Sequence, residues 1–331
     1  MKAVTINSFG GPEVFAVNDV AAPEAGPGQV RLQVRASSVN PIDTKIRSGA
    51  VPAVSPDFPA VLHGDVAGVV ESVGPGVSAL AVGDEVFGFA GGFKGHPGAL
   101  AELMVVDARL VTKKPAQLSL EDAGGLAIVG LTAWEATIVR NTIQPGDHVL
   151  VTGGTGGVGH LAVQLAAMAG GIVTTTASTS AKAGLAEGLG ANYIINYKEQ
   201  DVLAAAQEIT DGQGFQAIVE TVGGPNLENS FAQLATGGHI SCIASRATVD
   251  LTPLHGKAAS FAAVFVALPV LTGNGIEHHA AVQQRLAQLI DQEKLELLCD
   301  ERRFGFGEVG AAHAYLESGQ ATGKIILQND F

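Results

Sequence analysis

The sequence predicts an α/β protein, with a β-rich domain joined to a doubly wound domain that is built on a parallel sheet. Three observations support this class. Short alternating runs with frequent turns fill residues 1 to about 120, strand and helix patterns alternate from about 122 onward, and a glycine-rich turn opens the alternating part. At 331 residues the chain is long enough for about two domains that each bury a core.

The first part of the chain has the pattern of a β-rich unit. Segments 30–35 and 67–73 are rich in valine and predict strands. Turn residues recur about every 8–12 positions between such runs, as in all-β units. We therefore expect several short strands before residue 120.

The segment HVLVTGGTGGVG at 148–159 passes from an apolar strand through glycines into a helix. Its glycines at 154, 156 and 159 have the spacing of the dinucleotide-binding fingerprint, in which the first permits the tight turn, the second lets backbone approach a pyrophosphate, and the third lets helix pack on strand. Apolar residues at 149–151 predict the strand, and 158–168 predict the helix, whose N-terminus favours anions. The predicted cofactor-binding residues here are Gly154, Thr155, Gly156, Gly157, Val158 and Gly159. A glycine turn without a ligand is the alternative.

Strands and helices continue to alternate after this turn, which predicts parallel βαβ units. The predicted strands are 172–177, 193–195, 217–221 and 239–244, and the predicted helices between them are 181–189, 202–209 and 227–234. A long helix at 277–292 and a final strand at 323–327 follow, and we expect this strand to return to the first domain.

The end of the second strand of the doubly wound part indicates which nucleotide is bound. NAD-binding units carry an acidic residue there for the ribose 2′-hydroxyl. Segment 172–182 has hydroxyl side chains and one lysine, and no carboxylate occurs between residue 172 and Glu187. We interpret Ser178 and Lys182 as a pocket for a 2′-phosphate and predict NADPH as the cofactor. Alternatively, Lys182 is a solvated residue in the first turn of a helix.

Composition excludes several classes of partner. The formal net charge of −13 argues against nucleic acid or an anionic membrane surface. The longest apolar run, 261–271, contains Pro269 and is shorter than the roughly 20 residues of a membrane span. No signal-peptide pattern opens the sequence, and two cysteines suit a reducing compartment, so we expect a cytoplasmic protein.

The glycine turn belongs to an ordered set of motifs that covers nearly the whole chain. The other members are NPIDTKIRSG at 40–49, GDVAG at 64–68, GDEV at 83–86, GLTAW at 130–134, GA at 190–191 and GKIIL at 323–327. Together they resemble the zinc-independent quinone oxidoreductase (zeta-crystallin-like) branch of the medium-chain dehydrogenase/reductase superfamily.

The resemblance implies a GroES-like domain at 1–122, completed by about 297–331, and a Rossmann NADPH-binding domain at 123–296. It also implies a homodimer that reduces small quinones or other α,β-unsaturated carbonyl compounds with NADPH. An alcohol dehydrogenase or enoyl-thioester reductase on the same scaffold remains an alternative, as does a catalytically idle NADPH-binding protein. The apolar run 261–271 is expected in a subunit interface or over the substrate pocket.

The resemblance also bears on metal. Zinc enzymes of the superfamily place cysteine where this chain has Asn40 and histidine where it has Gly64, and no cysteine precedes Cys242. A catalytic zinc ion needs three protein ligands of the cysteine, histidine or carboxylate type. We therefore expect no metal, although His63 and Asp65 lie near the family's zinc positions.

Candidate catalytic residues follow from the family's cleft-lining positions. Asn40 is expected to bind a ribose or the substrate carbonyl, or else to cap a turn before Pro41. Lys45 stands where many relatives carry tyrosine and could polarise a carbonyl oxygen, or be solvated. Thr132 is expected at the nicotinamide ribose or substrate, or as a helix cap.

Four further side chains are candidates for a place near the site. Tyr197 is expected to pack on the adenine ribose, with ordinary strand-end packing as the alternative. His63 and His96 are candidate proton donors at the pocket mouth, because the pKa of histidine suits acid–base work near neutral pH. Asp43 is considered as the N-cap of a short helix that carries Lys45.

Overall fold

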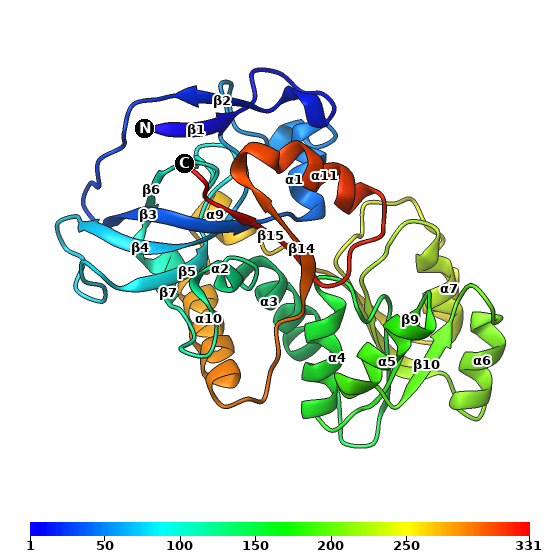
Figure 1. Cartoon of the computed structure of the whole chain (residues 1–331). Helices are drawn as coiled ribbons and strands as arrows, with labels where there is room; N and C mark the ends of the chain where they lie inside the picture. The colour runs from blue at the N-terminus through cyan, green and yellow to red at the C-terminus, as the bar shows by residue number, and fades with distance from the viewer. The chain divides into compact units, whose positions relative to one another are not determined.

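The computed structural model describes residues 1–331, and the chain divides into two compact units (Figure 1). The first unit comprises residues 1–128 and 267–331, and the second comprises residues 129–266. The sequence predicts boundaries at 122/123 and 296/297. They differ from this division chiefly because α10 (Ile276–Asp291) packs on β7 and on the 3₁₀ turn Ala108–Leu110 of the first unit.

The first unit is built on a seven-stranded, largely antiparallel sheet. Its strand order is β14-β15-β3-β4-β5-β7, and β6 also pairs with β3. The ten-residue strand β3 shares one edge between two partners, because its first half pairs with β6 and its end pairs with β15. The strands are β3 (Gln29–Ser38), β4 (Asp65–Val73), β5 (Glu85–Phe89), β6 (Leu103–Asp107), β7 (Val111–Lys113), β14 (Cys299–Gly305) and β15 (Lys324–Gln328).

The final strand returns to the first unit, as expected, since Ile326 lies opposite Ser38 in the antiparallel pair β15–β3. A separate two-stranded hairpin is formed by β1 (Lys2–Thr5) and β2 (Ala16–Asp19). The helices of this unit are α1 (Pro41–Arg47), α2 (Leu120–Ala123), α9 (Leu268–Thr272), α10 and α11 (Val309–Glu317).

The second unit is a doubly wound α/β domain, as predicted. Its six strands are all parallel, in the order β10-β9-β8-β11-β12-β13, which is the Rossmann order 3-2-1-4-5-6 within the domain. The strands are β8 (His148–Val151), β9 (Ile172–Ala177), β10 (Tyr193–Asn196), β11 (Phe215–Glu220), β12 (Leu234–Cys242) and β13 (Ser260–Ala263). The helices are α4 (Gly159–Met168), α5 (Ser180–Gly188), α6 (Val202–Ile209), α7 (Asn226–Gln233) and α8 (Thr252–Gly256).

A helix runs across the boundary between the units. It consists of α3 (Ala127–Trp134), which is followed directly by a five-residue π-helical turn, Glu135–Val139. Thr132 therefore lies inside the helix, and the alternative that it caps a helix starting at 133 is wrong.

The apolar segments of the sequence differ in how deeply the structure buries them. The inner strands of the parallel sheet are buried on both faces, with Leu150, Ile218 and Ile240 at the centre, whereas the edge strand β13 is largely exposed. The run 261–271 instead divides between the edge strand β13 and the short helix α9. No helix of the chain is long and apolar enough to cross a membrane.

Candidate active site

The predicted cofactor residues lie at the carboxyl ends of three adjacent strands of the second unit. The glycine turn follows β8, Ser178 and Lys182 follow β9, and Tyr197 follows β10. These strands are neighbours in the order β10-β9-β8. Open parallel sheets bind ligands at their carboxyl ends. The fold thus places the predicted nucleotide residues along one edge of the sheet.

The first glycines of the turn have roles that differ from the expectation. Gly153, not Gly154, adopts the left-handed conformation that opens the turn, with φ of 66°. Gly154 is required for another reason: a Cβ built on it would lie 2.1 Å from the hydroxyl of Thr175 on β9. That hydroxyl donates a hydrogen bond to the Val151 carbonyl at 2.6 Å. Gly154 therefore permits close packing of the turn on β9.

The later glycines bring α4 close to the turn and leave backbone donors available. A Cβ on Gly159 would lie 2.0 Å from the Gly153 carbonyl oxygen, so only glycine fits there. A Cβ on Gly156 would meet only that oxygen, at 3.2 Å. The amides of Gly157 and Val158 precede the first residue of α4 and have no partner within the chain. Amides at a helix N-terminus form an anion-binding arrangement, which fits a pyrophosphate.

Hydroxyl side chains that we did not predict hold this turn in place. The Thr176 hydroxyl accepts a hydrogen bond from the Gly153 amide at 2.9 Å. Thr152 and Thr221 bond reciprocally: the Thr221 amide donates to the Thr152 hydroxyl at 2.8 Å, and the Thr221 hydroxyl donates to the Thr152 carbonyl at 2.5 Å. No local signal marks these threonines, because their hydrogen bonds join segments that are 23 and 69 residues apart in the chain.

The residues expected at the adenosine end lie beside this turn. Tyr197 donates its amide to the Ala177 carbonyl at 3.2 Å, and its side chain is 50% exposed. Thr179 is the N-cap of α5, since its hydroxyl accepts a hydrogen bond from the Lys182 amide. Ser178 and Lys182 are both half-buried, one on each side of this cap. Their placement together is compatible with a phosphate pocket.

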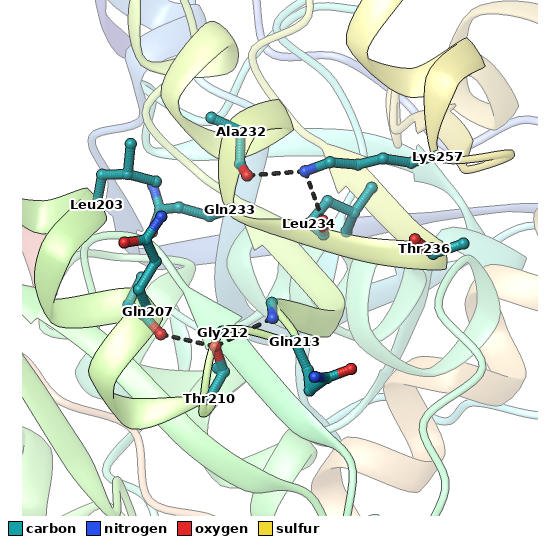
Figure 2. A pocket seen from close by; sticks show the side chains of 12 residues that line it. Leu203, Gln207, Thr210, Gly212, Gln213, Ala232, Gln233, Leu234, Thr236 and Lys257 are labelled. Atoms are coloured by element: carbon teal, nitrogen blue, oxygen red, sulfur yellow. Dashed lines mark hydrogen bonds between the residues drawn. The ribbon is translucent and has the colours of Figure 1, made fainter.

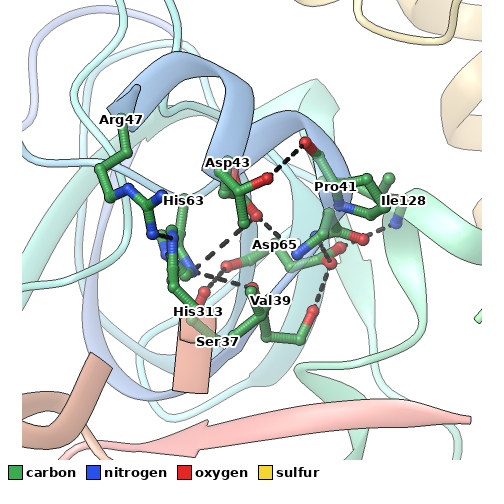
Figure 3. Close-up of polar contacts among 12 residues, drawn as sticks. Ser37, Val39, Pro41, Asp43, Arg47, His63, Asp65, Ile128 and His313 are labelled. Atoms are coloured by element: carbon green, nitrogen blue, oxygen red, sulfur yellow. Dashed lines mark hydrogen bonds and ion pairs between the residues drawn. The ribbon is translucent and has the colours of Figure 1, made fainter. Parts of the chain in front are cut away.

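A buried polar cluster, not predicted as such, lies in the first unit (Figure 3). Asn40 is 2% exposed and uses both ends of its amide: Nδ2 donates to Asp65 Oδ2 at 2.9 Å, and Oδ1 accepts from Lys324 Nζ at 2.7 Å. Lys324 is 2% exposed, its Nζ lies 3.7 Å from Asp65 Oδ2, and burial lowers its pKa. Asn40 thus links a carboxylate to an ammonium group.

Asp65, at the start of β4, joins the cluster to two further elements. Its Oδ2 also accepts from the Ser38 hydroxyl at 2.6 Å, and its Oδ1 accepts from the Ile128 amide at 2.8 Å. Ile128 is in the first turn of α3, where the amides lack intrahelical partners. A carboxylate there also favours the helix dipole. Asp65 therefore acts as a cap for α3 from a distant strand.

Asp43 is the third residue of α1, and Asn40 is the N-cap, so the alternative that Asp43 caps the helix is wrong. Its Oδ2 accepts the Asn40 amide at 2.8 Å. Its Oδ1 is buried without a hydrogen-bond partner. Burial raises the pKa of Asp43 to about 7, because desolvation disfavours the charged form.

A pair of buried histidines extends the cluster toward α11. His63 Nε2 lies 2.8 Å from His313 Nε2, His63 Nδ1 lies 2.8 Å from the Ser38 carbonyl, and Arg47 lies 3.3 Å from His313 Nδ1. Since a carbonyl only accepts, these contacts assign the proton of neutral His63 to Nδ1 and that of His313 to Nε2. Burial lowers the pKa of His63 to about 4 and that of His313 to about 2. The expectation of a proton donor at a pocket mouth is therefore wrong for His63, which is fully buried.

The other sequence-predicted residues are distributed over both units. Lys45 is exposed on α1, close in sequence to Asn40 in the first unit. Thr132 is buried in α3 and belongs to the second unit, together with the glycine turn. His96 is half-buried, and its carbonyl accepts from the Gly92 and Phe93 amides.

The side chains near the superfamily's zinc positions do not fit a zinc ion. The polar atoms of Asn40 and both oxygens of Asp65 are engaged within the protein. Both nitrogens of His63 are likewise engaged. A Cβ on Gly64 would lie 2.4 Å from the Phe89 ring and 2.7 Å from the Gly91 carbonyl, so no larger side chain fits there. No group of three or more histidine, cysteine, aspartate or glutamate side chains is placed to hold a metal.

A pocket of the second unit lies elsewhere (Figure 2). Its volume is about 280 Å³, and it lies between α6, α7 and the turn 212–214, at the amino ends of β11 and β12. Lys257 lines it but donates to three carbonyls, those of Phe231, Ala232 and Leu234, at 2.6–2.8 Å. Because ligands bind at the opposite edge of such sheets, we do not assign the nucleotide to this pocket.

Comparison with protein-family models gives two matches. Residues 26–116 match the alcohol dehydrogenase GroES-like domain, and residues 189–327 match a family described as zinc-binding dehydrogenase. The first match covers most strands of the first unit. The second covers part of each unit.

Individual proteins resemble nearly the whole chain. A 2-haloacrylate reductase of Burkholderia sp is 33% identical over 340 residues, covering 99% of this chain and 98% of that protein. A quinone oxidoreductase of Homo sapiens is 31% identical over 332 residues, covering 99% and 97%. The structure of Escherichia coli quinone oxidoreductase complexed with NADPH has a TM-score of 0.89 at 27% identity, covering 99% of this chain and 100% of that one.

Proposed function

The chain belongs to the zinc-independent quinone oxidoreductase branch of the medium-chain dehydrogenase/reductase superfamily. From this premise we propose that it transfers hydride from NADPH to quinones or other α,β-unsaturated carbonyl compounds. One observation carries the proposal. The glycine turn after β8 combines close packing at Gly154 and Gly159 with unpartnered amides at the start of α4. This arrangement fits the pyrophosphate of a nicotinamide dinucleotide.

The choice of NADPH over NADH rests on the end of β9. Ser178 and Lys182 flank the N-cap of α5, where NAD enzymes keep an acidic residue. A lysine there attracts a 2′-phosphate, whereas the 2′-hydroxyl of NADH gains little from it. The human relative's name and the NADPH complex of the Escherichia coli enzyme support the same cofactor and substrate class.

When bound, the nicotinamide ring supplies the hydride, and the protein supplies binding and orientation. We assign the pyrophosphate to the amides of the glycine turn, the 2′-phosphate to Ser178 and Lys182, and the adenine ribose to Tyr197. Thr132 is proposed to contact the nicotinamide ribose or the substrate. Lys45, exposed on α1, is proposed to polarise the substrate carbonyl.

The structure changes our proposal for Asn40. Both polar ends of its side chain are hydrogen-bonded to Asp65 and Lys324, and it is buried. We therefore propose that Asn40 fixes the start of α1, and so the position of Lys45, instead of touching the ribose or the carbonyl itself.

The test is whether purified protein catalyses the oxidation of NADPH by 1,4-naphthoquinone. The reaction is monitored through the loss of NADPH absorbance. We expect Lys182→Ala to lower kcat/KM for NADPH about tenfold, the scale of one lost charged contact, and to leave NADH unchanged. The control, Lys294→Ala, changes an exposed lysine of the first unit and should leave both coenzymes unaffected. Binding of neither coenzyme would refute the proposal. Zinc-dependent turnover of alcohols, or tight NADPH binding without turnover of any acceptor, would favour the alternatives named above.

We also propose that the protein is a homodimer in solution and acts in the cytoplasm. β13 is the outer strand of the parallel sheet, and Phe261 and Phe265 are 36% and 50% exposed on and beside it. An open strand edge with exposed aromatic rings favours pairing with another copy. Both cysteines are free thiols, which suits a reducing compartment. Sedimentation of wild type and of Phe261→Glu tests the dimer, and a monomeric wild type would exclude it.

A further inference from the structure

A buried carboxylate stands at the carboxyl end of β11, outside the residues assigned above. Glu220 is 0% exposed, and its Oε1 accepts from the amides of Val222 and Gly223 at 2.7 and 2.8 Å. Its Oε2 accepts from Asn226 Nδ2 at 2.8 Å and from the Ser230 hydroxyl at 2.6 Å. All four donors are neutral. Because two of them come from the turn 221–225 and two from α7, the carboxyl group of Glu220 holds the turn against the start of that helix.

These four bonds satisfy the hydrogen-bonding capacity of a buried carboxyl group. Buried polar groups are found in folded proteins where such partners are supplied. Asn226 opens α7, so the carboxylate also lies near the positive end of that helix. The hydrogen bonds of Glu220 thus fix the path of the backbone immediately after β11.

The same turn is tied to the nucleotide loop by its first residue. Thr221 makes the two reciprocal hydrogen bonds with Thr152, the residue that precedes the glycine turn. A Cβ built on Gly153 would lie 3.2 Å from the Thr221 hydroxyl. Glu220 and the pair Thr152–Thr221 therefore form one continuous brace from α7 to the glycine turn.

The other side of the turn is equally constrained. Gly223 is left-handed, with φ of 74°, and a Cβ on it would lie 2.4 Å from the Ala244 carbonyl beyond β12. The Ile243 amide donates to the Glu220 carbonyl at 3.1 Å. The brace thus joins the loops that follow β8, β11 and β12 at the edge where the nucleotide is assigned.

We propose that Glu220 and Thr221 are positioning residues for the nucleotide, which hold the glycine turn in its binding conformation before the cofactor arrives. The inference rests on the proposed function, because it concerns the same nucleotide site. A loop held in its bound conformation loses less conformational entropy on binding, so the brace raises affinity without contacting the cofactor.

The test compares two threonine-to-valine variants, which remove a hydroxyl with little change of shape. Thr221→Val removes the bond to the Thr152 carbonyl. The control, Thr210→Val, removes the buried hydroxyl that donates to the Ala206 carbonyl at 2.7 Å and accepts from the Gly214 amide at 3.0 Å, at the opposite edge of the same sheet.

NADPH affinity, measured by fluorescence titration, should fall about tenfold in Thr221→Val, the scale of one hydrogen bond, and should stay at the wild-type value in Thr210→Val. Thr221→Ser keeps the hydroxyl and should restore affinity. The KM for NADPH should change more than kcat. Thr210→Val removes two hydrogen bonds of a buried hydroxyl and should lose at least as much thermal stability as Thr221→Val, so a purely structural role predicts at least as large a loss of affinity in Thr210→Val.

Glu220→Gln gives a second, independent measurement, because a glutamine NH₂ group cannot accept from two of the four donors. We expect Glu220→Gln to bind NADPH more weakly than wild type. In the double variant with Thr221→Val, the fold-loss of affinity should be smaller than the product of the two single losses, because both residues act through one brace. Wild-type affinity in Thr221→Val, or a loss in Thr210→Val at least as large as that in Thr221→Val, would overturn the inference. Failure of the wild-type protein to bind NADPH would instead refute the proposed function and, with it, this role.

Discussion

Replacing Gly159 with alanine tests the geometry of the nucleotide loop most directly. The added Cβ would lie 2.0 Å from the Gly153 carbonyl oxygen and 2.8 Å from the Gly153 carbonyl carbon. Real Cβ contacts begin near 3.0 Å, and the atoms in the way are backbone, so the loop itself must move. Overpacking of this kind costs about 1–3 kcal/mol of folding free energy.

The chain offers a matched control in Gly184→Ala. Gly184 lies in the interior of α5, and a Cβ on it meets no atom within 4 Å. Alanine there should stabilise the protein by about 0.5–1 kcal/mol, because glycine is a poor helix former. The two variants thus make the same chemical change with opposite expected signs.

The assay is urea denaturation together with NADPH titration. We expect Gly159→Ala to unfold at lower urea and to bind NADPH at least about tenfold more weakly, because its loop amides are displaced from the start of α4. Gly184→Ala should bind normally. Wild-type stability and affinity in Gly159→Ala would show that the close approach of α4 to the turn is not as described.

Three further predictions concern the first unit and metal. Asp43 is protonated up to a pH of about 7 in the folded protein but ionises near 3.8 when unfolded, so its contribution to stability falls as the pH rises between these values. The free energy of unfolding of Asp43→Asn should therefore rise relative to that of wild type as the pH increases across this window, measured by denaturation at several pH values. The lowered pKa values of the histidines act in the opposite direction, but the histidines are present in both proteins and their effects cancel. Asp65→Asn should cost about 3–5 kcal/mol, because buried Lys324 loses its carboxylate partner, whereas Asp57→Asn at an exposed position should cost nothing measurable in the same experiment. Treatment with a zinc chelator should leave quinone-dependent NADPH oxidation unchanged, and activity that falls and returns with added zinc would contradict the zinc-free assignment.

The regular elements of the second unit were predictable because each depends on local sequence. The strand 172–177 and the helix 202–209 have the predicted bounds, and most other elements differ by one to three residues. Apolar runs, alternation and glycine spacing all act over fewer than about twenty residues. The strand β12 is the exception, since it begins at Leu234, five residues before the predicted start, where irregular pairing with β11 extends it.

The buried polar groups were not predictable in the same way. The sequence predicts a role for Asn40 at the ribose or the substrate, yet its partners, Asp65 and Lys324, are 25 and 284 residues away in the chain. His63 resembled an accessible histidine in a glycine-rich loop, and only the packing of α11 places His313 against it. The brace at Glu220 was likewise hidden, because four donors from a turn and a helix are needed to recognise its function.

The sequence by itself determined the order of strands and helices, the position of the glycine turn, and the absence of an acid beside Ser178 and Lys182, because these are properties of neighbouring residues. Only the tertiary structure decided which polar atoms are already engaged. A buried carboxylate, amide or imidazole must find partners wherever the fold supplies them, and those partners come from strands and helices that are distant in the chain.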